Sequence, residues 1–258
     1  MSPPDAETAS AAGAEAREEL PRMSLIEHLE ELRKRLVRSL IAVGLAFLVC
    51  WIFVQKIADF LARPIYEVLE PGERLVFLGV TDPFILYVKM AALSGLFVAS
   101  PIVLYQFWRF VAPGLYRKER LYAVPFVAFG SFFFLAGGAF AYYVAFPFAV
   151  EFLIGMGEAY EPAITVTHYF GFLLLIMLGL GLMFELPIVI FFLAQIGVVT
   201  PRFLMRHFRW AVLGIFVLAA VLTPTPDVVN LCIFALPTIG LYLLGVGAAA
   251  VVSRKSKA

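Results

Sequence analysis

Long apolar segments alternate with short polar loops along almost the whole chain. A helix that crosses a bilayer needs roughly 20 apolar residues, with a range of about 17–25. The pattern therefore predicts six spanning helices, near 37–54, 83–105, 121–146, 169–196, 210–223 and 228–252. The fifth segment has only 14 residues, which at about 1.5 Å per residue is shorter than the ~30 Å hydrocarbon core. We expect an all-α membrane protein with a short final hairpin.

The composition agrees with a membrane architecture. Hydrophobic residues make up 62% of the chain and charged residues 15%, whereas soluble domains are roughly half apolar and a quarter charged. The formal net charge of +1 gives no indication of nucleic-acid binding. Cys50 and Cys232 both lie in apolar segments, so we interpret them as small hydrophobic residues rather than as a disulfide or metal site.

The basic residues divide unequally between the two sides of the predicted bundle. Sixteen of the 20 Lys and Arg residues lie before or at the start of span 1, between spans 2 and 3, between spans 4 and 5, or after span 6. The positive-inside rule places these regions, and therefore both termini, in the cytoplasm. Residues 1–22 lack the apolar core of a signal peptide and are predicted to form a disordered tail. The membrane domain is expected over 23–252, followed by a basic cytoplasmic tail at 253–258.

The segment 24–36, SLIEHLEELRKRL, has the pattern of an amphipathic helix that leads into span 1. Its leucines recur on one face. Glu30 with Lys34 and Glu31 with Arg35 are favourable pairs at i, i+4 spacing. One interpretation is an interfacial helix whose charges are paired with one another. The alternative is that Glu31 accepts a cationic ligand.

The loop between spans 2 and 3, at 107–122, contains one acid, Glu119, among three basic neighbours. Local charge neutralisation is one explanation. The other is that Glu31 and Glu119 lie on the same membrane face and bind guanidinium groups together. A carboxylate binds arginine in a bidentate geometry that lysine cannot reproduce, so such a site would prefer arginine.

The segment 179–193, GLGLMFELPIVIFFL, has a single charged residue, Glu185, among fourteen apolar ones. A charge at the centre of a spanning helix costs on the order of 3 kcal/mol even on the insertion scale. In one interpretation Glu185 is buried and donates a hydrogen bond to the carbonyl of Met183, which Pro187 leaves without its helical partner. In the other, Glu185 is a polar docking point for a partner helix within the membrane.

Four sequence blocks occur in order along 24–252: HLEELRKRL before span 1, SPIVLYQFWRFVAPGLYRKER at 100–120, FELP in span 4 and TPTPD before span 6. Together they resemble TatC, the multispanning receptor of the twin-arginine protein translocase. The resemblance implies six spanning helices with a concave face. It also implies binding of the twin-arginine signal peptides of folded proteins, docking of the single-span subunits TatA and TatB, and self-association in a receptor complex. Export would be driven by the proton gradient, and the chain would lie in the inner membrane of a prokaryote.

The resemblance further implies roles for individual residues. The positions matching its signal-peptide site are Glu31, Arg33, Pro101, Phe110, Tyr116 and Glu119. The positions matching partner docking are Glu185, Thr223, Thr225 and Asp227, and structural roles are expected for Pro64 and Pro187. The chain departs from many relatives in having Leu231, where they have Gln, four residues after the aspartate.

A function of another class is also open, a proton-coupled secondary transporter that uses Glu185 as its relay. The lack of an apparent repeat and of a second intramembrane acid argues against it. We do not expect an enzyme, because the chain contains neither G-x-S-x-G nor H-E-x-x-H. No cofactor is expected, and the nucleotide-binding pattern G-x-x-x-x-G-K-[ST] does not occur.

Overall fold

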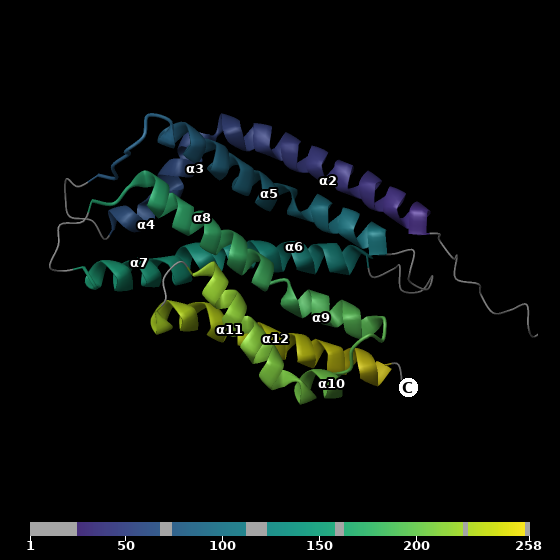
Figure 1. The fold of residues 1–258 in the computed structure, drawn as a ribbon. Coiled ribbons are helices and arrows are strands. Elements are labelled where there is room, and N and C mark those ends of the chain that lie inside the picture. Colours follow the sequence, from purple (N-terminus) through teal and green to yellow (C-terminus); the bar gives the residue numbers. More distant parts are fainter. Residues whose placement is uncertain (1–24, 68–73, 112–122, 158–162, 224–226, 256–258) are drawn as a thin grey trace, which may run out of the picture.

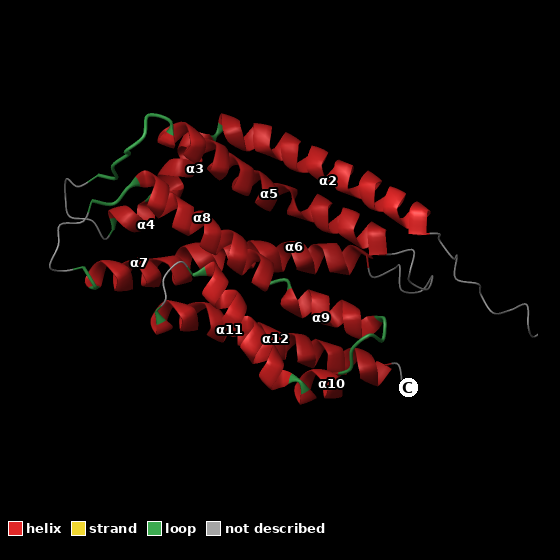
Figure 2. Cartoon of the chain, viewed as in Figure 1, coloured by secondary structure: helices red, strands yellow, loops and turns green. Residues whose placement is uncertain are grey.

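The computed structural model describes residues 25–67, 74–111, 123–157, 163–223 and 227–255. Within these ranges the ordered elements are helices, apart from one isolated parallel β-bridge between Val76 and Thr165 (Figure 2). The elements are α2 (Leu25–Ile52), α3 (Val54–Leu61), α4 (Arg63–Tyr66), α5 (Asp82–Val111), α6 (Ala123–Phe140), η3 (Ala141–Ala145), α7 (Phe146–Gly155), α8 (Val166–Met183), α9 (Leu186–Gln195), α10 (Pro201–Arg206), α11 (Phe208–Leu222) and α12 (Val228–Lys255).

The six predicted spans are all present as apolar helices. Five segments of the described chain are long and apolar enough to cross a membrane: Ile26–Ile52, Asp82–Val111, Val124–Gly155, Val166–Gln195 and Val228–Val251. The sixth, α11, is apolar but has only 15 residues. The all-α prediction with a short helix before the last span is therefore confirmed.

The third span is longer than the apolar pattern predicts. Its expected end is Phe146. Instead α6 continues through one π turn, η3, into α7 and ends at Gly155. Pro147 lies in the first turn of α7, where a residue without an N–H group is tolerated. The proline therefore does not end the span.

Close contacts between helix backbones define the packing. Helix α2 lies along α5 at one side of the bundle (Figure 1). A Cβ atom on Gly95 of α5 would lie 2.8 Å from the backbone nitrogen of Phe47 in α2, so only glycine fits there. Helix α12 also lies close to the start of α9, because a Cβ atom on Gly245 would lie 3.2 Å from the backbone Cα of Pro187 and 2.9 Å from the side chain of Ile190. Small residues at helix crossings are typical of membrane bundles.

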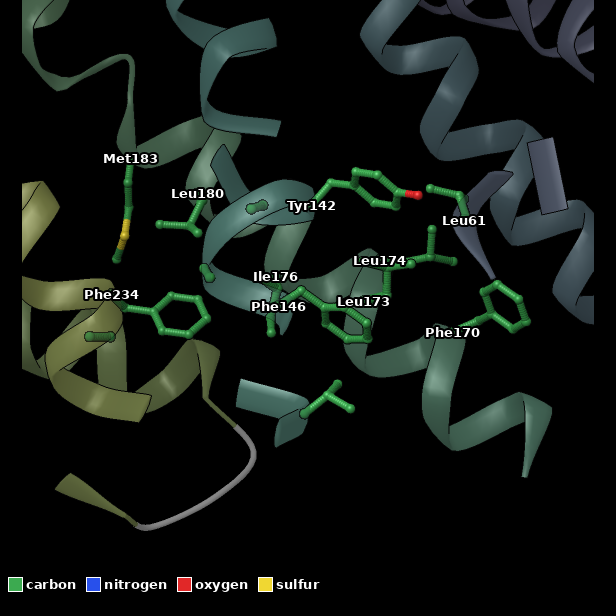
Figure 3. Packing of buried hydrophobic residues seen from close by; sticks show 14 of the residues in the cluster. Leu61, Tyr142, Phe146, Phe170, Leu173, Leu174, Ile176, Leu180, Met183 and Phe234 are labelled. Atoms are coloured by element: carbon green, nitrogen blue, oxygen red, sulfur yellow. The ribbon is translucent and has the colours of Figure 1, made fainter. Parts of the chain in front are cut away.

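The fourth span lies at the centre of the bundle and the first at its edge. In the most apolar part of the fourth span 56% of the residues are buried, against 6% in the first. The core includes Phe146, Leu173, Ile176, Leu180 and Phe234, all without exposed surface (Figure 3). The fourth span therefore packs against other helices over more than half of its most apolar part.

Helices α3 and α4 form an elbow between the first two spans, with Pro64 in the first turn of α4. Pro64 has no N–H to donate to the carbonyl of Phe60, four residues earlier. The hydroxyl of Tyr142 donates to that carbonyl at 2.6 Å. The hydroxyl of Tyr169 donates to the neighbouring carbonyl of Leu61 at 3.1 Å. Two tyrosines from other spans thus hold the elbow that contains Pro64.

The predicted tail at 1–22 lies outside the described residues. Helix α2 begins at Leu25 and runs without a break to Ile52, so the amphipathic segment 24–36 and span 1 share one helix. At the other end, α12 continues to Lys255, inside the range 253–258 for which a basic tail is predicted. The domain boundaries themselves stay predictions.

Candidate functional site

Five polar and aromatic side chains meet where the start of α2 packs against the end of α5. We call this group the α2–α5 cluster: His28, Glu31, Arg35, Gln106 and Phe110. The first three recur at helical spacing on one face of α2, and the other two are four residues apart on α5. The rings of His28 and Phe110 stack at 4.5 Å between centroids. Phe110, predicted to belong to the signal-peptide site, therefore lies in the same group as Glu31.

Glu31 and Arg35 form the partly buried ion pair of this cluster. Arg35 Nη2 donates to Glu31 Oε1 at 2.9 Å, and the side chains are only 13% and 16% exposed, respectively. The second pair predicted on α2, Lys34 with Glu30, is longer at 3.6 Å and is 68% and 65% exposed. Both predicted i, i+4 pairs are confirmed, but only the Glu31 pair is shielded from water.

The hydrogen-bonding capacity of the Glu31–Arg35 pair is incompletely used. Arg35 Nη1 also donates to Gln106 Oε1 at 3.4 Å, across 71 positions of the sequence. Oε2 of Glu31 and Nε of Arg35 are buried and have no hydrogen-bond partner among the described residues. An unsatisfied buried carboxylate oxygen is costly unless a donor reaches it. The cluster therefore presents one strong acceptor that is available for a ligand.

The remaining residues of the predicted signal-peptide site are dispersed. Arg33 lies on α2 and is exposed. Pro101 lies in the middle of α5 and is also exposed. Glu119 and Tyr116 lie outside the described residues, so the predicted pairing of Glu119 with Glu31 stays a prediction.

Pro101 removes one backbone hydrogen bond from α5, and the side chain of the preceding residue, Ser100, replaces it. Pro101 has no N–H for the carbonyl of Phe97. The hydroxyl of Ser100, which is buried, donates to that carbonyl at 2.8 Å. The helix thus passes through Pro101 with this carbonyl satisfied, as expected for prolines inside membrane helices.

The fourth span breaks at Glu185. Helix α8 ends at Met183 and α9 begins at Leu186, with Pro187 in its first turn. Pro187 has no N–H for the carbonyl of Met183, which explains why the helix cannot continue there. Pro187 is fully buried and contacts the region of Gly245 in α12. The structural role predicted for Pro187 agrees with this break.

The carboxyl group of Glu185 lies against α6 rather than on its own helix. Its Oε2 atom lies 3.3 Å from the point that a Cβ atom on Gly130 would occupy, and Leu104 of α5 borders the same point. Oε1 is buried and has no hydrogen-bond partner among the described residues. No hydrogen bond to the carbonyl of Met183 is found there, so the self-contained interpretation of Glu185 is not supported.

The predicted docking residues of the final hairpin have local roles at helix ends. Thr223 is buried, and its hydroxyl donates to the carbonyl of Ala219 at 2.8 Å. Asp227 precedes α12, and its two oxygens accept from the backbone N–H and the side-chain amide of Asn230 at 2.7 and 2.8 Å. This is the geometry of a helix N-cap. Thr225 lies outside the described residues.

Sequence reasoning missed Gln106, His28 and Gly130. Each acts through a contact with a different helix, and nothing in its own sequence neighbourhood indicates that contact. A metal centre is not indicated either, since no three His, Cys, Asp or Glu side chains come together in the described part of the chain.

A family model described as Sec-independent protein translocase protein (TatC) matches residues 27–237. The chain belongs to the TatC family. The match includes Glu31, Glu119, Glu185 and Asp227. Among similar TatC proteins, that of Koribacter versatilis is 46% identical over 94% of this chain and 90% of its own length. TatCy of Bacillus subtilis is 36% identical over 93% of this chain and 94% of its own length.

The fold is also that of solved TatC proteins. A crystal structure of the twin-arginine translocase receptor TatC matches with a TM-score of 0.77 and 33% identity, covering 88% of this chain and all of the other. A structure of the TatC receptor in the detergent DDM matches with a TM-score of 0.78. The multispan architecture, including the short helix before the last span, is therefore that of the TatC family.

Proposed function

We propose that this chain is the receptor component of a twin-arginine translocase that binds twin-arginine signal peptides of folded proteins. The observation that carries the proposal is the unsatisfied Oε2 atom of Glu31, held in a partly buried carboxylate at the start of α2. Guanidinium groups are the cations best matched to a carboxylate in such a setting. Glu119, from the same family match, is proposed as the second carboxylate.

The orientation in the membrane follows from the basic residues. We place both termini, and with them the α2–α5 cluster, on the cytoplasmic side of the inner membrane, because 16 of the 20 Lys and Arg residues lie on that side. A signal peptide emerging from the cytoplasm would then meet Glu31 directly. Its apolar part would extend along the bundle towards Glu185.

Glu185 is proposed as the intramembrane docking point of the single-span subunits TatA and TatB. Its buried Oε1 atom has no partner among the described residues, although the fourth span lies at the centre of the bundle. A polar side chain on a partner helix could donate to this oxygen within the lipid. Self-association in a receptor complex is proposed as well, and the proton gradient as the energy source.

Site-specific photocrosslinking tests the signal-peptide site. Photoreactive probes would replace residues beside Glu31 and Glu119 in membranes that receive a signal peptide with Arg-Arg or with Lys-Lys. We expect crosslinks with Arg-Arg that are lost with Lys-Lys. Equal crosslinking would show that charge alone suffices, and no crosslinking would reject the site.

A matched pair of variants separates Glu31 from general charge. Glu31→Gln removes the negative charge of the partly buried acceptor, and we expect it to weaken peptide binding about tenfold, as for the loss of a charged partner worth ~1.4 kcal/mol. Glu30→Gln removes the same charge one residue earlier, from an exposed pair, and should change little. Equal effects of the two variants would contradict a specific role for Glu31.

A further inference from the structure

The carboxylate of Glu31 is already bound to a guanidinium group that belongs to the chain itself. Arg35 Nη2 lies 2.9 Å from Oε1 of Glu31. Of the two carboxylate oxygens, Oε2 is the one that has no partner among the described residues. Bidentate binding of an arginine requires both oxygens of one carboxylate. Arg35 occupies one acceptor position of Oε1, so a second guanidinium group that binds both oxygens must share Oε1 with Arg35.

The burial of the pair makes the competition stronger. Both side chains are less than a fifth exposed, so water screens their charges poorly. An incoming arginine would also be repelled by the positive charge of Arg35 at short range. The exposed pair of Lys34 with Glu30 lacks this shielding.

The α2–α5 cluster offers Arg35 another acceptor. Arg35 Nη1 lies 3.4 Å from Oε1 of Gln106 on α5, a long hydrogen bond in the present arrangement. If Arg35 leaves Glu31, this contact can shorten and keep the guanidinium group hydrogen-bonded. The exchange would then leave the guanidinium group with a hydrogen-bond acceptor, although Gln106 carries no charge.

We propose that Arg35 is an internal competitor that occupies Glu31 at rest and moves to Gln106 when a signal-peptide arginine binds. This inference rests on the proposed function of Glu31. It makes Arg35 a regulatory residue of the site, because the ligand must displace it. Arg35 then lowers the affinity for the signal peptide, whereas Gln106 raises it.

The test measures binding of a labelled synthetic Arg-Arg signal peptide to the full chain in lipid nanodiscs. We expect Arg35→Gln to tighten binding about fivefold, since it removes a partly buried competitor. Arg35→Lys should give a smaller gain, because the ammonium group keeps the positive charge that competes for Glu31. Gln106→Met keeps the side-chain length and removes the second acceptor, so binding should weaken about threefold.

The control is Lys34→Gln, which removes the same charge from the same helix but breaks only an exposed pair. It should leave the affinity unchanged, which separates displacement from a general loss of repulsion. Unchanged or weaker binding in Arg35→Gln, in samples that elute as the wild type does, would overturn the inference. If the wild-type chain does not bind the Arg-Arg peptide, or if Glu31→Gln binds it equally well, the proposed function fails instead.

Discussion

The Oε2 atom of Glu185 lies 3.3 Å from the point where a Cβ atom of residue 130 would be if Gly130 were any other residue. Helix α6 therefore leaves a space on its surface that the carboxyl group of Glu185 borders. On the other side of the same space, Leu104 would be 3.0 Å from that Cβ atom. Gly130 thus determines where the intramembrane carboxyl group can lie.

Substitution of Gly130 should displace the Glu185 carboxyl group. Gly130→Ala needs a shift of a few tenths of an ångström, and Gly130→Val a larger one, with overpacking costs of about 1–3 kcal/mol. If Glu185 docks partner subunits, both variants should export less of a twin-arginine cargo, and Gly130→Val should lose more export than Gly130→Ala. Gly44→Ala is the control, because nothing lies within 4 Å of its Cβ position. Normal export by Gly130→Val at equal protein levels would refute this prediction.

Removal of either tyrosine hydroxyl from the α3–α4 elbow should destabilise the protein. Tyr142→Phe and Tyr169→Phe each leave a carbonyl of α3 without its side-chain donor, at a cost of about 1 kcal/mol. We expect Tm in detergent to decrease by about 2–4 °C for each variant. Tyr143→Phe serves as the control, since Tyr143 is 66% exposed. An equal decrease of Tm in all three variants would show that the loss of any tyrosine hydroxyl has this effect, and not the loss of a hydrogen bond to the elbow.

The hydroxyl of Ser100 should matter only while Pro101 is present. Ser100→Ala leaves the carbonyl of Phe97 without a donor and should cost about 1 kcal/mol. In Pro101→Ala the backbone N–H of residue 101 can bond to Phe97, so the further loss of Ser100 should cost almost nothing. A double-mutant cycle of unfolding free energies measures this coupling. Additive effects would mean that Ser100 does not compensate for the proline.

Asp227 should have separable effects on stability and on export. Asp227→Ala removes the N-cap of α12 and should lower the unfolding free energy by about 1 kcal/mol. Asp227→Ser keeps a capping oxygen and should retain most of that stability. If Asp227 also docks a partner, Asp227→Ser should still lose cargo export while its Tm stays near that of the wild type. Full export by Asp227→Ser would limit the residue to capping.

Local patterns along the sequence were sufficient to predict much of this fold. The apolar segments predict the spans because each helix must satisfy its own backbone in lipid. The i, i+4 spacing predicts the pair of Glu31 with Arg35, and the missing N–H of Pro187 predicts an irregularity near Met183. In each case the interacting groups lie within a few residues of one another.

Contacts between helices could not be predicted in this way. Arg35 meets Gln106 only because α2 and α5 cross closely at Gly95, and neither residue carries a local sign of the other. The third span extends beyond Phe146 because a π turn precedes Pro147, which an apolar pattern does not indicate. The position of Glu185 against Gly130 likewise depends on how α9 packs beside α6.

The elbow that contains Pro64 also constrains the order in which the chain can be assembled. Its carbonyl at Phe60 is bonded by a residue 82 positions later, and the one at Leu61 by a residue 108 positions later. During synthesis the first two spans are therefore made before either tyrosine. The elbow stays incompletely bonded until the fourth span is inserted, and a nascent chain halted before Tyr169 would expose it to proteolysis.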